Sequence, residues 1–181
     1  MNLPNKITMV RIFLIPVFII CLLVTFPYHA LIATIVFIVA SASDSLDGHL
    51  ARSRNLVTDF GKFMDPLADK LLVSSAFVCL VQLQLIPAWV VICILSREFA
   101  ITGLRTLAAA DGVVIAASKW GKAKTMSQMI AVIALLFYTT EIFHFAALLT
   151  FGTVMVYVAL ALTLYSGYDY FRLNKGVFKT M

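Results

Sequence analysis

Long apolar stretches separated by short polar segments dominate the chain. A transmembrane helix needs about 20 mostly apolar residues. Six stretches reach or approach this length, and they cover approximately residues 8–25, 30–50, 60–83, 87–108, 125–140 and 145–170. The first is N-terminal, but no small-residue cleavage site of a signal peptide follows it, so we interpret it as a span. The pattern predicts an all-α integral membrane protein with six transmembrane helices.

The positions of the basic residues predict how these helices are oriented. Neither lysine nor arginine occurs in residues 12–51, 71–96 or 125–171. Each of these intervals matches one outward helix and one return helix, so all 14 basic residues fall on one side of the membrane or in its half of the bilayer. Membrane proteins place such an excess of Lys and Arg on the cytoplasmic side. We therefore expect both termini in the cytoplasm and three turns, near Pro27, 84–87 and 141–144, on the opposite face.

Composition agrees with a membrane location. Apolar residues make up 62% of the chain and charged residues only 13%, against about 25% charged residues in a typical soluble domain. These values exclude a disordered chain, a collagen-like chain and a small disulfide scaffold. The three cysteines lie in apolar runs without the spacing of a metal site. We expect a single membrane domain over residues 1–181 and no nucleic-acid partner.

Acidic residues are few and concentrated. Five of the nine fall within 26 residues, namely Asp44, Asp47, Asp59, Asp65 and Asp69. The i,i+3 and i,i+4 spacings place Asp44 with Asp47, and Asp65 with Asp69, each on one face of a helix. Facing carboxylates near a membrane repel one another unless they bind protons or a cation. Oxygen ligands without His or Cys favour Mg²⁺ or Mn²⁺, and four acids suffice for two ions.

These acids belong to a longer motif, D-x2-D-G-x2-A-R-x8-G-x3-D-x3-D. Its fixed positions are filled by Asp44, Asp47, Gly48, Ala51, Arg52, Gly61, Asp65 and Asp69. The motif resembles the signature of the CDP-alcohol phosphotransferase family, and no fixed position departs from it. The resemblance implies a six-helix enzyme of the inner (cytoplasmic) membrane, commonly a homodimer, with its active site open to the cytoplasm and the lipid.

The resemblance also implies roles for individual residues. Asp44, Asp47 and Asp65 match metal ligands, and Asp69 matches a fourth acid that touches the metals and acts as general base. The CDP group is expected to contact the remaining motif positions and the "PN..T..R" stretch near the N-terminus, that is Gly48, Ala51, Arg52, Gly61, Asn5, Thr8 and Arg11. Helix packing for Gly48, a lipid-phosphate contact for Arg52 and an ordinary interfacial helix cap for the N-terminal stretch stay open as alternatives.

A cluster of basic residues predicts the binding site for the acceptor. It comprises Arg97, Arg105, Lys119, Lys122 and Lys124, on the fourth helix, the following loop and the start of the fifth helix. Such cations suit a phosphorylated acceptor, although ordinary cytoplasmic-side charge explains the lysines equally well. Glu98 is expected to orient Arg105 or to neutralise Arg97.

Three further segments indicate which acceptor substrate is used. They are NLPNKITMVRIFLIP, SREFAITGLR and SKWGKAKTMSQM, and they are similar to the bacterial branch of the family that acts on sn-glycerol 3-phosphate. This similarity implies transfer of a phosphatidyl group from CDP-diacylglycerol to that acceptor, with release of CMP. Inositol phosphate, serine or a lipid alcohol are alternative acceptors on the same scaffold. A cation transporter is a more distant alternative, since it would need acids across both halves of the membrane.

Overall fold

The computed structural model describes residues 3–53, 59–110 and 118–173, without the side chains of 3–6, 44–53, 59–63, 65, 66 and 110. In these residues it contains six helices and no strand. The helices are α1 (Leu3–Leu23), α2 (His29–Ser53), α3 (Asp59–Gln82), α4 (Ala88–Ala110), α5 (Lys119–Thr139) and α6 (Ala146–Leu173). The predicted all-helical architecture is confirmed.

Two helix boundaries differ clearly from the sequence prediction, and the first is the start of α1, which lies at Leu3 rather than near residue 8. α5 begins at Lys119, whereas the apolar pattern placed its start at residue 125. Ser118 caps the helix, because its extended backbone lets the hydroxyl accept a 3.0 Å hydrogen bond from the Gly121 amide. A serine cap satisfies one of the unpaired amides of a first turn. The first turn of α5 is thus polar, and a search for apolar runs does not detect it.

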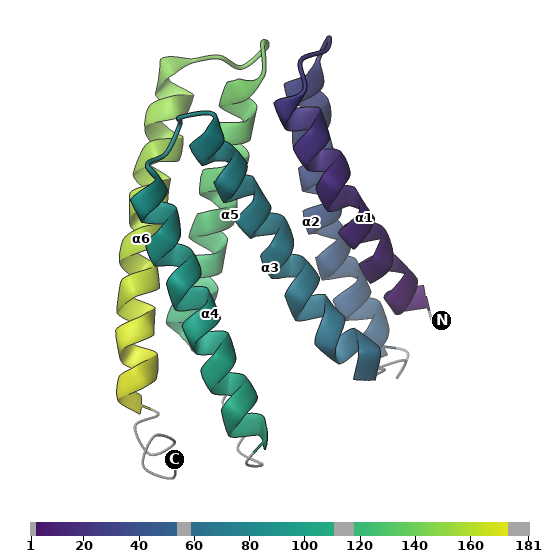
Figure 1. Ribbon diagram of the computed structural model, residues 1–181, viewed down its shortest axis with the longest axis vertical. Helices are drawn as coiled ribbons and strands as arrows, with labels where there is room; N and C mark the ends of the chain where they lie inside the picture. The colour runs from purple at the N-terminus through teal and green to yellow at the C-terminus, as the bar shows by residue number, and fades with distance from the viewer. Residues whose placement is uncertain (1–2, 54–58, 111–117, 174–181) are drawn as a thin grey trace.

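The helices run roughly side by side along the long axis of the molecule (Figure 1). α1 packs with α2 and α5 packs with α6, while α3 contacts α1, α2, α4 and α5. The core between them is apolar and includes the fully buried Phe18, Phe37, Phe77, Leu80 and Leu135. Charged groups near this core therefore lie where helices meet, and their positions are set by the packing.

Close approach of α5 and α6 depends on one glycine. A Cβ atom at Gly152 would lie 2.7 Å from Cδ2 of Leu135 and 3.4 Å from its backbone nitrogen. Real Cβ atoms essentially never approach other heavy atoms within 3.0 Å. Only glycine permits this separation of the two helices, since every other residue adds the obstructing carbon.

The helix ends are arranged as the charge pattern predicts. α1 begins and α6 ends at one end of the bundle, and the turns after α1, α3 and α5 lie at the other (Figure 1). Among the described residues, α6 is the one helix both long and apolar enough to cross a membrane by composition alone, and Ile7–Leu23 and His29–Ser43 are shorter apolar helices. The six spans and the cytoplasmic termini stay predictions.

Candidate active site

The four predicted metal ligands lie on two consecutive helices. Asp44 and Asp47 belong to the C-terminal part of α2, and Asp65 and Asp69 to the N-terminal part of α3. These two helices pack against each other, and the parts that carry the acids lie at the same end of the bundle (Figure 1). Carboxylate oxygens are the ligands that a hard divalent cation prefers.

Only one of these four side chains lies in the described part of the chain. Asp69 is half-buried and lines a cavity between α3, α4 and α5. The side chains of Asp44, Asp47, Asp65, Ala51, Arg52 and Asn5, and the surroundings of Gly48 and Gly61, lie outside what the structure describes. The described residues contain no group of three or more His, Cys, Asp or Glu suited to a metal, so the proposed ligand set stays a prediction.

The N-terminal helix places an arginine beside the aspartate motif. Arg11 is 1% exposed, and its Nε donates hydrogen bonds to the Ala40 carbonyl (3.2 Å) and to Oγ of Ser43 (3.4 Å). Ser43 immediately precedes Asp44 in α2. Thr8 lies one turn before Arg11 and is also buried. Arg11 therefore contacts the turn of α2 just before the motif, and the contact of Thr8 and Arg11 with a nucleotide stays a prediction.

The cavity beside Asp69 has a volume of about 80 Å³, enough for several water molecules. Residues of three helices line it: Asp69, Lys70, Val73, Ser74, Phe77, Ile94, Leu95, Glu98, Lys124, Thr125 and Gln128. Its polar groups include two carboxylates and two lysines. A carboxylate that could accept a proton and cations that could bind a phosphate thus face one small space.

Glu98 is the centre of the charges in this region. Its Oε1 accepts a hydrogen bond from Arg97 Nη1 at 3.2 Å and another from Lys124 Nζ. Lys70 Nζ donates to Oγ1 of Thr102, which in turn donates to the Glu98 carbonyl at 2.7 Å. Lys70, Arg97 and Lys124 thus surround a single glutamate. We call Lys70, Arg97, Lys124 and Glu98 the cationic cluster. Its net positive charge suits an anionic ligand.

Arg97 also reaches the last helix. Its Nη2 donates a 2.9 Å hydrogen bond to Oγ of Ser166, and its Nε is buried without a hydrogen-bond partner. Ser166 is fully buried in α6. The sequence analysis did not single out this serine, because a serine inside an apolar helix has no spacing that distinguishes it from a packing residue.

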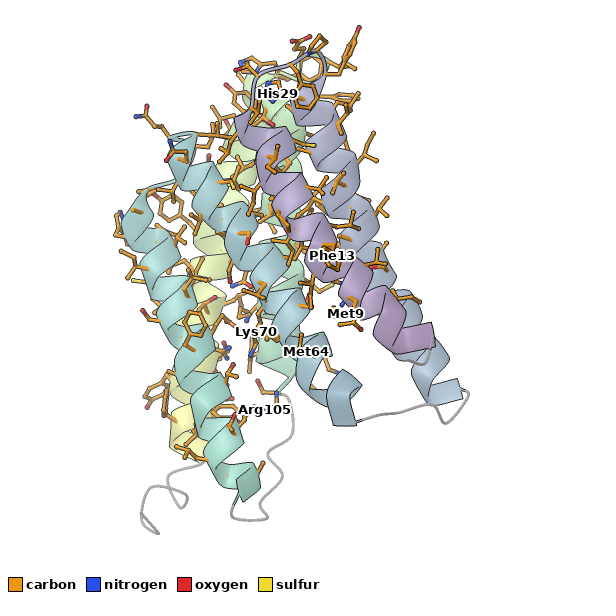
Figure 2. All side chains as sticks on the ribbon, turned by 45° about the vertical axis from the view of Figure 1, so that its right-hand side comes forward. Met9, Phe13, His29, Met64, Lys70 and Arg105 are labelled. Carbon is orange, nitrogen blue, oxygen red and sulfur yellow. The ribbon has the colours of Figure 1, made fainter. Side chains whose placement is uncertain are left out.

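The five predicted acceptor-site cations fall into two groups. Lys124 is buried and Arg97 is half-buried, and both contact Glu98. The contact between Glu98 and Arg97 is one of the two alternatives that the sequence analysis gave for Glu98. Arg105, Lys119 and Lys122 are exposed, although Arg105 is close enough to Lys70 to interact electrostatically with it. Figure 2 shows Lys70 and Arg105 in the lower half of the bundle, away from the end at which His29 lies.

Comparison with known proteins defines the class of this protein. Residues 1–165 match the model of the CDP-alcohol phosphatidyltransferase family. The chain belongs to this family, which confirms the prediction made from the aspartate motif. Enzymes of the family generally use divalent metals.

Relatives with a curated name are similar along their whole length. The chain is 49% identical over 193 residues to the CDP-diacylglycerol--glycerol-3-phosphate 3-phosphatidyltransferase of Bacillus subtilis, with 99% of this chain and 98% of that protein covered. It is 37% identical to the protein of the same name from Rickettsia bellii, with 98% and 97% covered. The corresponding values for Haemophilus influenzae are 38% identity with 97% and 94% covered.

Proposed function

We propose that the protein transfers the phosphatidyl group of CDP-diacylglycerol to a hydroxyl of sn-glycerol 3-phosphate, forming phosphatidylglycerophosphate and releasing CMP. The observation that carries this proposal is the complete aspartate signature in a chain that is 49% identical, over its full length, to a bacterial protein named for this reaction. The cavity that joins Asp69 to the cationic cluster supports it independently.

Asp44, Asp47, Asp65 and Asp69 would hold the metals, two ions of Mg²⁺ or Mn²⁺. When bound, divalent ions neutralise the charge of a pyrophosphate and stabilise the departing phosphate. Arg11 and Thr8 border this region from α1, where Arg11 bonds the turn of α2 that precedes Asp44. With Asn5, Gly48, Ala51, Arg52 and Gly61 they would bind the CDP group, since small residues let a ligand approach the backbone.

Asp69 is the proposed general base. An alcohol is too weak an acid to ionise unaided, and a positioned carboxylate can accept its proton as the new bond to phosphorus forms. Asp69 lines the same cavity as Lys124 and Lys70. A compact acceptor with a phosphate at one end could therefore place that phosphate on the lysines and its hydroxyl near Asp69.

The cationic cluster favours a phosphorylated acceptor over serine. Lys70 and Lys124 line the cavity directly. Arg97 adds positive charge next to the cavity through its contact with Glu98. Arg105, Lys119 and Lys122 would add a weaker attraction from their exposed positions. Inositol phosphate carries the same kind of group as glycerol 3-phosphate, so the choice between these two rests on the similarity to the named relatives.

The exposed surface of the helices supports a membrane location. Large apolar side chains are exposed on several of them, for example Phe13 (68%) on α1 and Phe99 (65%) on α4. Soluble monomers rarely expose large contiguous apolar areas, whereas lipid-facing helices do so throughout. We propose six spans in the inner membrane with the aspartate end and both termini in the cytoplasm, and a homodimer as the assembly.

An acceptor panel tests the proposed function. Purified protein in lipid vesicles receives labelled CDP-diacylglycerol, Mg²⁺ and, separately, sn-glycerol 3-phosphate, inositol phosphate, serine or a lipid alcohol. Phosphatidylglycerophosphate and an equal amount of CMP should form only with glycerol 3-phosphate, and chelation of the metal should stop the reaction. Preference for another acceptor would overturn the proposed substrate, and metal-independent turnover would overturn the metal assignment. Cation flux without CMP release would favour a transporter.

A further inference from the structure

Arg97 is held by an arrangement on α6 that nothing in the aspartate motif requires. Its Nη2 donates to Oγ of Ser166 at 2.9 Å. The Ser166 hydroxyl itself donates to the Thr163 carbonyl at 3.1 Å, so its lone pairs are available to the guanidinium. Thr163 and Ser166 are both fully buried. The Ser166 oxygen that accepts the hydrogen bond from Arg97 is therefore held in one orientation.

The residue after this serine makes room for the arginine. A Cβ atom at Gly167 would lie 3.2 Å from Cγ of Arg97 and 3.7 Å from its Nε. A contact of 3.2 Å is tighter than nine in ten real Cβ contacts. The aliphatic part of Arg97 therefore lies directly on the backbone of α6, and a larger residue would displace it.

This placement leaves one polar atom of Arg97 without a partner. Nε is buried and makes no hydrogen bond, which costs free energy because buried donors are normally paired. The other two nitrogens are used, Nη2 on Ser166 and Nη1 on Glu98. The arginine thus connects α6 to Glu98, and Glu98 in turn contacts Lys124, which lines the cavity.

We propose that Ser166 and Gly167 are positioning residues of the acceptor site, and that they act on the phosphorylated acceptor through Arg97, Glu98 and Lys124. This inference rests on the proposed function. It gives α6 a role in acceptor affinity, in a part of the helix that lies beyond residue 165, where the match to the family model ends.

The test compares Ser166→Ala and Gly167→Ala with the wild type, using the phosphorylated acceptor that the wild type turns over in the panel. Ser166→Ala removes the hydrogen bond to Arg97, and Gly167→Ala displaces Arg97 from it. We expect the KM for that acceptor to rise about tenfold in each variant, which corresponds to the loss of one hydrogen bond to a charged group. The kcat and the KM for CDP-diacylglycerol should change less than about twofold if the effect is confined to the acceptor side.

Two other glycines provide matched controls. Gly103→Ala on α4 should leave the kinetics unchanged, because a Cβ there meets no atom within 4 Å. Gly152→Ala should lower the thermal stability, because its Cβ would collide with Leu135, yet the acceptor KM of the folded fraction should stay at the wild-type value. An equal rise in acceptor KM for Gly152→Ala and Gly167→Ala would overturn the inference, because it would show that any disturbance of α6 weakens acceptor binding.

A double-mutant cycle tests the route of action. If Ser166 acts through Arg97, the pair Arg97→Ala and Ser166→Ala should have the acceptor KM of Arg97→Ala alone. Additive effects, or single variants within twofold of the wild type, would overturn the inference. These outcomes are ratios between variants, so they are distinct from a failure of the wild type to prefer glycerol 3-phosphate, which would overturn the proposed function only.

Discussion

The aspartate end of α2 and α3 and the cationic cluster, whose residues come from α3, α4 and α5, are built in opposite ways. The acids lie within 26 residues on two consecutive helices, so helical spacing alone places each pair on one face of its helix. The cluster joins Lys70, Glu98 and Lys124 from three helices, and Arg97 links it to Ser166 of α6. Sequence spacing can reveal the first kind of site, whereas the second is defined only by how the helices pack.

The two regions also differ in charge, and they meet at one cavity. Asp69 belongs to the acidic side, and Lys124 and Lys70 to the basic side, yet all three line the same space. Glu98 is the common ion-pair partner of two cations, Arg97 and Lys124. Removing one member of a buried ion pair is costly because it leaves the other uncompensated. Substitutions should therefore have different consequences on the two sides.

The largest expected effect comes from the acidic side. Asp69→Asn should lower kcat by a factor of about 10² to 10⁴, the usual contribution of a general base, while metal and CDP binding persist. CMP release and equilibrium binding of CDP measure the two quantities separately. Glu141→Gln is the matched control, because Glu141 is exposed in the turn after α5. Near-normal turnover of Asp69→Asn would remove its role as base.

A smaller effect is expected on the basic side. Lys124→Gln should raise the KM for the phosphorylated acceptor about 10- to 100-fold, because it removes a charged hydrogen-bond donor from the cavity. Lys122→Gln should change this KM by less than about twofold, since the side chain of Lys122 is exposed and exposed charges contribute little. Steady-state kinetics with varied acceptor measure both. Equal effects of the two substitutions would show that the lysines act only as general surface charge.

The smallest effect that should exceed that of the Lys122 control is expected at Arg105. Arg105→Ala should raise the acceptor KM about two- to threefold at low ionic strength, because its charge reaches the cluster through solvent. Raising the salt concentration should abolish the difference from the wild type, since exposed charges are screened. The measurement is the acceptor KM at two salt concentrations. A large, salt-independent rise would place Arg105 in direct contact with the substrate.

The helices could be predicted from the sequence because each contains a long run of apolar residues. It missed the first turn of α5, where Ser118 caps a polar segment. The motif predicted the family, which the comparison confirmed. Arg97 was predicted as part of a cationic site, but Ser166 and Gly167 were not. Gly152 and Gly167 are both glycines of one apolar helix, and only the structure shows that the first meets a leucine and the second an arginine.

The contact between Glu98 and Lys124 also bears on the order in which the chain is assembled. During synthesis α4 emerges before α5, and it contains Arg97 and Glu98 as adjacent residues bonded at 3.2 Å. Such a helix carries a counter-ion for its own arginine. The ammonium of Lys124 reaches that carboxylate only once α5 has packed into the bundle, so the positive charge of Lys124 is added after its partner Glu98 is already part of the chain.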